Sequence, residues 1–171
     1  MIINERTSTL ERIGRAAHSS DLSHRSGRLT DADVLGAVGA AGIHHRHGSE
    51  ILRMMLSLGN GDDEPTIREV VRAEGKRHGW SILGNSGLVA RVARAALAHF
   101  RNPACPTCSG RSYIYAEHQQ VTPCPQCDAT GKRPVTGRFA REIRAVLKAM
   151  DRLRDEALEG INRQLGRPAW A

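Results

Sequence analysis

Four cysteines in one short stretch constrain this chain more than any other feature. They form two Cys-x-x-Cys pairs, Cys105 with Cys108 and Cys124 with Cys127, and fifteen residues separate the pairs. This spacing is typical of a zinc site, because each pair turns back under one metal ion and the intervening residues suffice for a short hairpin. Four thiolates complete a tetrahedron, so we predict one Zn²⁺ ion that is structural and has no open position for catalysis.

Disulfide or redox chemistry is the alternative explanation for two Cys-x-x-Cys pairs. The metal is favoured because no βαβ pattern surrounds either pair and the N-terminus has no apolar signal-peptide region. The thiols are then expected in a reducing compartment, the cytoplasm.

The residues between the two pairs predict a β-hairpin. Tyr113, Ile114, Tyr115 and Val121 favour strands and flank a polar tip. His118 lies at that tip and is a possible further ligand. Because the cysteines already fill the coordination shell, we interpret it as a solvated turn residue.

Hydrophobic periodicity predicts helices on both sides of this hairpin. The helical stretches are 29–48, 49–59, 87–102 and 136–166, and residues 60–80 predict a loop followed by a helix. Gly36, Gly39 and Gly42 recur every three residues, which we interpret as a surface for the close approach of a neighbouring helix. The predicted fold is mainly α, a helical domain with a zinc-stapled four-cysteine β-hairpin inserted between two long helices.

These elements divide the chain into four predicted parts. We expect a loosely ordered N-terminal segment over 1–28, a helical domain over 29–102, the four-cysteine zinc hairpin over 103–134 and a basic amphipathic helix over 135–171. No apolar run approaches the roughly 18 residues of a membrane span, so no membrane partner is expected. An enzyme is not expected either, because no nucleophile motif, phosphate loop or carboxylate pair stands out.

Positive charge is concentrated in the second half of the chain. The net charge is +7; residues 1–85 hold 11 basic and 11 acidic side chains, whereas residues 86–171 hold 14 and 7. This asymmetry indicates a polyanionic partner, and a solvated surface is the alternative explanation. An aromatic content of 4% disfavours binding of single strands by base stacking. The candidate DNA-binding residues are Arg138, Arg141, Arg144 and Lys148.

The order of elements resembles that of the phage lambda-type Q antitermination proteins. The likeness covers roughly residues 30–147. It rests on the helices "TDADVLGAVGAAG", "IREVVRAEGKRHG" and "LVARVARAALAHF", followed by "CPTCSGR", a hairpin, "CPQCDATGKR" and a helix beginning near "RFAREIRAV". It implies a late-gene regulator in the cytoplasm of a bacterial host. Such a protein binds double-stranded DNA in a late promoter, engages the host RNA polymerase and its sigma factor, and makes the polymerase read through terminators. The resemblance also implies that the four cysteines are the zinc ligands.

The C-terminal helix departs from this family. Its members have a helix-turn-helix after the metal site, whereas residues 139–165 contain no Gly, Pro or Asn before Gly160 and predict one continuous helix. The expected modes of DNA binding are therefore a basic helix face in the major groove or contacts to phosphates.

A DnaJ-like chaperone or protein-interaction module is the alternative function. The stretches "CPTCSGRS" and "CPQCDATGK" resemble degenerate copies of the Cys-x-x-Cys-x-Gly-x-Gly motif of these co-chaperones. That family has four such motifs and two metal ions, whereas this chain has two motifs and no His-Pro-Asp tripeptide. We therefore favour antitermination.

Overall fold

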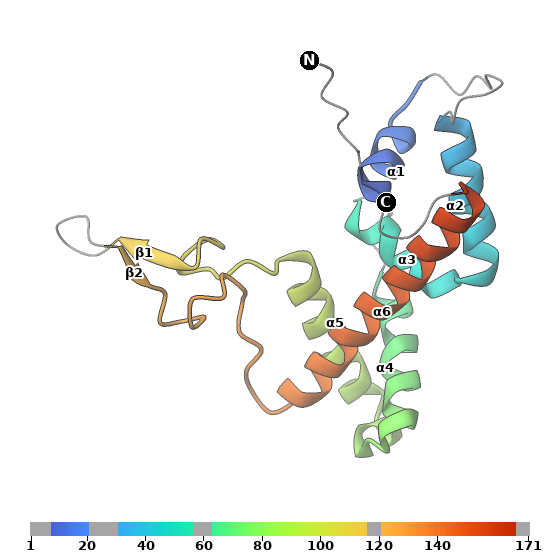
Figure 1. The fold of residues 1–171 in the computed structure, drawn as a ribbon. Helices are drawn as coiled ribbons and strands as arrows, with labels where there is room; N and C mark the ends of the chain where they lie inside the picture. The colour runs from blue at the N-terminus through green and yellow to red at the C-terminus, as the bar shows by residue number, and fades with distance from the viewer. Residues whose placement is uncertain (1–7, 21–30, 57–62, 116–120, 167–171) are drawn as a thin grey trace. The chain divides into compact units, whose positions relative to one another are not determined.

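A computed structural model describes residues 8–20, 31–56, 63–115 and 121–166. The described residues form six α-helices, one 3₁₀ helix and a two-stranded antiparallel sheet (Figure 1). In chain order the elements are α1 (Thr9–Ala17), α2 (Asp31–His44), α3 (Arg46–Met55), α4 (Glu64–His78), η1 (Ser81–Gly84), α5 (Ser86–Arg101), β1 (Tyr113–Tyr115), β2 (Val121–Pro123) and α6 (Ala140–Gln164). The predicted fold, mainly α with a small hairpin between the last two helices, is confirmed.

Contacts within the chain define two compact units. Unit 1 comprises residues 1–66 and 149–171, and unit 2 comprises residues 67–148. This division differs from the four predicted parts, because α4 and α6 each begin in one unit and end in the other. Within the described ranges, none of the helices has both the length and the apolar character needed to cross a membrane.

Helix α1 belongs to the core of unit 1, although it falls in the segment 1–28 that we expect to be loosely ordered. A capping box starts this helix: the Ser8 hydroxyl accepts from the N–H of Glu11 at 3.3 Å, and the Glu11 carboxylate accepts from the N–H of Ser8 at 2.7 Å. Ile13 and Ala16 are buried in an apolar cluster with residues of α2, α3 and α6. This burial orders the helix despite its polar flanks, while residues 1–7 and 21–30 lie outside the described residues.

Close packing between helices in unit 1 depends on a glycine other than the predicted ones. A Cβ atom on Gly48 of α3 would overlap the carbonyl oxygen of Leu153 and would lie 2.8 Å from the Cβ of Ala157, both in α6. Gly36 and Gly39 of α2 are exposed, and no described atom lies within 4 Å of a Cβ built on either. The interpretation of these two glycines as a packing surface is therefore wrong.

Helix α4 ends in a glycine-based cap in unit 2. Gly79 has φ +65°, and the N–H of Trp80 donates to the carbonyl oxygen of Gly75 at 2.9 Å. This bond spans five residues back across a left-handed glycine, which is the Schellman arrangement. The chain then enters η1, where Ile82 is buried.

Helix α5 begins directly after η1 and Asn85, with a side-chain cap. The Asn85 side-chain oxygen accepts from the N–H of Leu88 at 3.1 Å. Ser86, also of a residue type that favours the cap position, is the first residue of the helix. The buried face of α5 consists of Val89, Ala90, Val92, Ala93, Ala96 and Leu97.

Candidate metal centre

The hairpin brings the two cysteine pairs together. Strands β1 and β2 pair with Tyr113 opposite Pro123, so the first cysteine pair precedes β1 and the second follows β2 at the same end of the hairpin. The N–H of Cys124 donates to the carbonyl oxygen of Ser112 at 3.0 Å, which extends the pairing to the start of the second pair. The predicted hairpin is confirmed, and His118 lies outside the described residues.

The four sulfur atoms are placed as metal ligands. They all lie within 4.8 Å of one another, with 4.0 Å between the Sγ atoms of Cys105 and Cys124 and 3.8 Å between those of Cys108 and Cys127. A tetrahedron with zinc–sulfur bonds of about 2.3 Å has sulfur–sulfur edges of about 3.8 Å. All four cysteines are free, since these distances are far longer than a disulfide bond of about 2.05 Å. The cluster can therefore hold one metal ion.

Left-handed backbone at each cysteine pair makes this placement possible. Ser109 and Gly110 follow the first pair with φ 49° and 82°, and Asp128 and Ala129 follow the second with φ 48° and 58°. Positive φ costs about 1 kcal/mol or more at a residue other than glycine. Ser109, Asp128 and Ala129 all have positive φ, which indicates that the surrounding contacts hold the two turns in place.

One hydrogen bond joins the two turns, and another closes the second turn. The N–H of Cys105 donates to the carbonyl oxygen of Gly131 at 2.8 Å, and the hydroxyl of Thr130 donates to the carbonyl oxygen of Cys127 at 2.6 Å. Gly131 has φ +69°, and a Cβ atom on it would lie 2.5 Å from the carbonyl oxygen of Gly110. The second turn therefore requires a glycine at this position.

Backbone N–H groups point at the first sulfur of each pair. The N–H groups of Cys108 and Thr107 donate to the sulfur of Cys105 and lower the pKa of this thiol to about 7. Burial raises the pKa of the Cys124 thiol to about 11, although the N–H groups of Gln126 and Cys127 act in the opposite direction. A buried cluster of thiols accepts one negative charge readily and resists further ones. A bound cation is what allows all four thiols to ionise together.

The cysteine cluster is nearly inaccessible to solvent. The exposed fractions of the four cysteines are 0%, 1%, 0% and 5% in chain order, and Ile114 packs against them from β1. Four ligands of one kind, all buried, leave no coordination position for water or substrate. The arrangement suits a structural role for the ion.

The four predicted DNA-binding residues are exposed and lie at the start of α6 or just before it. One guanidinium nitrogen of Arg144 donates to the carbonyl oxygen of Val135 at 3.1 Å, and the guanidinium of Arg138 lies 5.5 Å from the ring centre of Phe139. Arg141 and Lys148 form no hydrogen bond or ion pair with any described residue. Two of the four side chains therefore have local contacts, and two are available to a partner.

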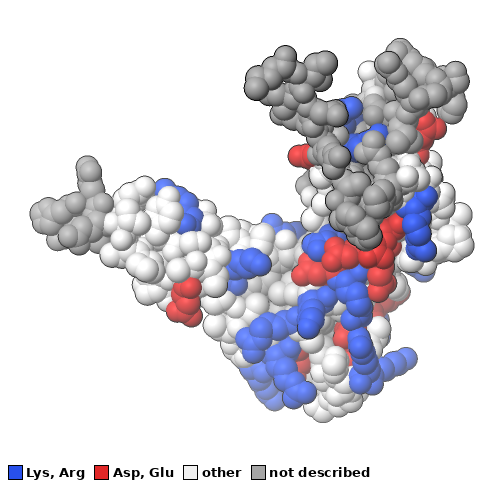
Figure 2. Space-filling model, viewed as in Figure 1, with Lys and Arg blue, Asp and Glu red and all other residues white. Residues whose placement is uncertain are grey.

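The net positive charge of the chain lies in unit 2. Residues 67–148 contain 14 Lys and Arg and 5 Asp and Glu, a net charge of +9, whereas the rest of the chain has 11 basic and 13 acidic residues and a net charge of −2. Figure 2 shows Lys and Arg side chains gathered over α4 and the first turns of α6. The predicted residues at 138–148 are thus a minority of a larger basic surface.

The outer face of the hairpin is apolar and exposed. Tyr113, Tyr115 and Val121 are 37%, 62% and 59% exposed, and the two tyrosine rings meet edge to face with centres 5.8 Å apart. Ile114, between them in sequence, packs against the cysteines. The alternation of strand residues could have predicted this two-sided hairpin from sequence.

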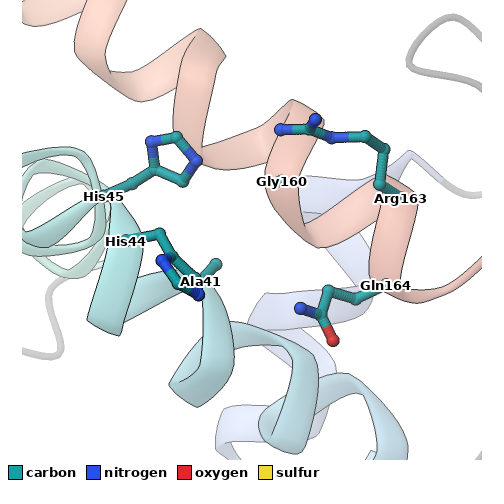
Figure 3. Close-up of a pocket in the computed structure, with 6 residues that line it drawn as sticks. All are labelled: Ala41, His44, His45, Gly160, Arg163 and Gln164. Carbon is teal, nitrogen blue, oxygen red and sulfur yellow. The ribbon is translucent and has the colours of Figure 1, made fainter.

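The histidines near residue 45 line a pocket in unit 1. Its volume is about 460 Å³, and Figure 3 shows the imidazoles of His44 and His45 extending toward Arg163 and Gln164 of α6. His47 is not part of it and lies 3.7 Å from the carboxylate of Glu50. Among the described residues, only the four cysteines are arranged to hold a metal ion.

Comparisons with known proteins add no assignment. Neither a scan against protein-family models nor a search of curated proteins found a match. The function is therefore inferred from the metal centre and the charged surfaces described above.

Proposed function

We propose that this protein is a transcription antitermination factor that resembles the phage lambda-type Q proteins and performs no chemical step. It binds double-stranded DNA in a late promoter, engages the host RNA polymerase and its sigma factor in the bacterial cytoplasm, and lets the polymerase read through terminators. The observation that carries the proposal is a closed four-cysteine centre within a strongly basic helical unit.

The proposed metal is one structural Zn²⁺ ion. Thiolates are soft ligands, and a buried set of four thiolates is the typical structural zinc site. The ion contributes positive charge that stabilises the four thiolates, and folding of the hairpin is coupled to its binding. The chain supplies the geometry through the turns at Gly110 and Gly131, which meet at the base of the hairpin.

The charge of unit 2 supports a nucleic-acid partner. A site of four thiolates and one Zn²⁺ ion carries a charge of −2, which leaves a unit with 14 basic and 5 acidic residues strongly positive. Such a surface attracts DNA phosphates and releases their counterions on binding. The basic residues of α6, Arg141 and Lys148 in particular, are suited to phosphate contacts.

Footprinting and gel-shift measurements test this function. The zinc-loaded full-length protein is added to the late-promoter DNA of the phage or prophage that encodes it, with and without host RNA polymerase, over a series of salt concentrations. We expect sequence-specific protection that a promoter-paused polymerase strengthens. A protein that binds neither this DNA nor the paused complex would contradict the proposal. Salt-sensitive binding to any DNA, with no response to polymerase, would contradict its antitermination part.

The exposed face of the hairpin supports the alternative of a chaperone-like or protein-interaction module. Tyr115 and Val121 are directly opposed and both more than half exposed, which suits contact with another protein. Suppression of aggregation of an unfolded client, without DNA binding, would favour this alternative. In the antitermination proposal the same face is free to contact the polymerase.

A further inference from the structure

Helix α5 carries an exposed stripe of arginines and small residues. The exposed positions recur every four and three residues, which places them on one face of the helix. They are Gly87, Arg91, Arg94, Ala98 and Arg101. The first and the last are 14 positions apart, a length of about 21 Å along the helix. We call this face the α5 stripe.

The α5 stripe is free of acidic residues. The helix contains no Asp or Glu at any position. Arg91 has no hydrogen bond or ion pair with any described residue, and Arg94 contacts the carbonyl oxygen of Ala90 in its own helix at 3.4 Å. In the later turns of α6, by contrast, the guanidinium of Arg154 pairs with two carboxylates of its own helix, each at 2.8 Å. An exposed arginine such as Arg91 is available to phosphates and base edges.

The segment before α5 holds the start of the helix in place. The Schellman turn at Gly79 ends α4, and the 3₁₀ turn η1 follows directly after Trp80. Leu83 packs against Gly75 so closely that a Cβ on this glycine would lie 2.6 Å from the Leu83 Cδ2 atom. Trp80 and Ile82 are buried in the turn. Helix α4, the turn and α5 therefore form a helix-turn-helix segment with a packed turn.

The small residues of the α5 stripe leave room for a partner on either side of the Arg91–Arg94 pair. Gly87 and Ala98 have no side chain beyond Cβ, so the helix backbone can approach a partner closely at both ends of the Arg91–Arg94 pair. The major groove of B-DNA is about 12 Å wide and admits one α-helix. In helix-turn-helix proteins the second helix lies in this groove, and its N-terminal residues contact base edges. The first turn of α5, without acidic residues, is suited to an adjacent phosphate.

We propose that α5 is the helix that enters the major groove of double-stranded DNA, with Arg91 and Arg94 as its principal contacts. The inference rests on the proposed function in that it requires DNA binding. It assigns recognition of the DNA sequence to α5, which precedes the metal centre, and not to the C-terminal helix α6. The basic residues of α6 then contribute phosphate contacts, which position the protein without reading sequence.

Fluorescence anisotropy on the zinc-loaded full-length protein tests the inference. The probes are a DNA duplex of about 30 base pairs, selected from a random pool by the wild-type protein, an unselected duplex and a single-stranded RNA of the same length. The α5 variant is Arg91→Gln/Arg94→Gln, and the α6 variant is Arg141→Gln/Lys148→Gln. The control, Arg53→Gln/Arg163→Gln, removes the same charge from exposed positions of unit 1. Ala98→Leu adds bulk to the α5 stripe without changing charge, and circular dichroism verifies that each variant is folded.

We expect the α5 variant to lose at least about tenfold in affinity for the selected duplex and most of its preference over the unselected one. Ala98→Leu lowers affinity several-fold because it holds the helix away from the groove, and the α6 variant weakens binding to both duplexes equally. Wild-type affinity in both the α5 variant and Ala98→Leu would overturn the inference while leaving the proposed function intact. Stronger binding to RNA than to either duplex would overturn the assignment of the partner. Failure of the wild-type protein to bind any duplex would refute DNA binding itself.

Discussion

Replacement of Gly48 by alanine tests the helix packing of unit 1 most directly. Gly48 is buried in α3, and its Cβ would overlap the Leu153 carbonyl oxygen and crowd the Cβ of Ala157 in α6. Backbone atoms cannot move aside as a flexible side chain does, so the two helices must separate. Overpacking of this kind costs about 1–3 kcal/mol. An alanine in a helix interior gains up to about 1 kcal/mol over glycine, and less in the first turn, where Gly48 lies.

The matched control is Gly36→Ala in α2. Gly36 is exposed and helical, and no described atom lies within 4 Å of a Cβ at this position. Its replacement should stabilise the protein by about 0.5–1 kcal/mol through helix propensity alone. The two variants make the same chemical change, so their difference measures the packing of α3 against α6.

Urea denaturation followed by circular dichroism of the helices gives the free energy of unfolding. We expect Gly48→Ala to unfold at a lower urea concentration than wild type and Gly36→Ala at a higher one. The free energies of the two variants should differ by about 1–3 kcal/mol, or about 1 M urea at an m value of about 2 kcal/mol/M. If Gly48→Ala is as stabilising as Gly36→Ala, the close approach of the two helices is refuted.

Two further predictions concern the metal centre and a nearby histidine. Cys108→Ser should reduce the bound zinc, measured by atomic absorption, to well below one ion per chain and unfold the hairpin. The control Thr107→Ser, at an exposed position, should change neither the zinc content nor the hairpin. Full zinc content in Cys108→Ser would show that Cys108 is not a ligand. Burial, and then the charge of Arg133, lower the pKa of His99 below 6.5, so the unfolded chain binds this proton more readily. The free energy of unfolding should therefore fall as the pH drops below about 6.5 toward the lowered pKa. Urea titrations at about pH 7.5 and 5.5 should show a smaller fall in His99→Gln than in the wild-type protein. An equal fall in the variant and the wild type would contradict the role of His99.

The cluster of four cysteines was predictable from sequence because the residues that form it are close together in the chain. The spacing of Cys105, Cys108, Cys124 and Cys127 specifies two turns and a hairpin, and no distant contact is needed to bring them together. The same holds for the hairpin strands and for the periodic helices. The exposed aromatic face of the hairpin follows from the same alternation.

Tertiary contacts decided the features that the sequence did not predict. Gly36 and Gly48 are both helical glycines, and only the distant residues that surround each one determine which permits close packing. Helix α1 has polar flanks, and its order depends on burial of Ile13 against helices far along the chain. The two-unit division was not predictable either, because α4 and α6 are continuous in sequence across the boundary.

The hairpin has few apolar contacts that could stabilise it without the proposed metal ion. A two-stranded hairpin is marginal in water, and here Ile114 is the one partly buried apolar residue packed against the cysteines among the described residues. Burial of Ile114 and of the four cysteines is a small apolar contribution against the backbone entropy lost in ordering the hairpin and its two turns. We expect coordination of the proposed metal ion to supply the further free energy. Loss of the metal should therefore unfold the hairpin first and free the link between α5 and α6.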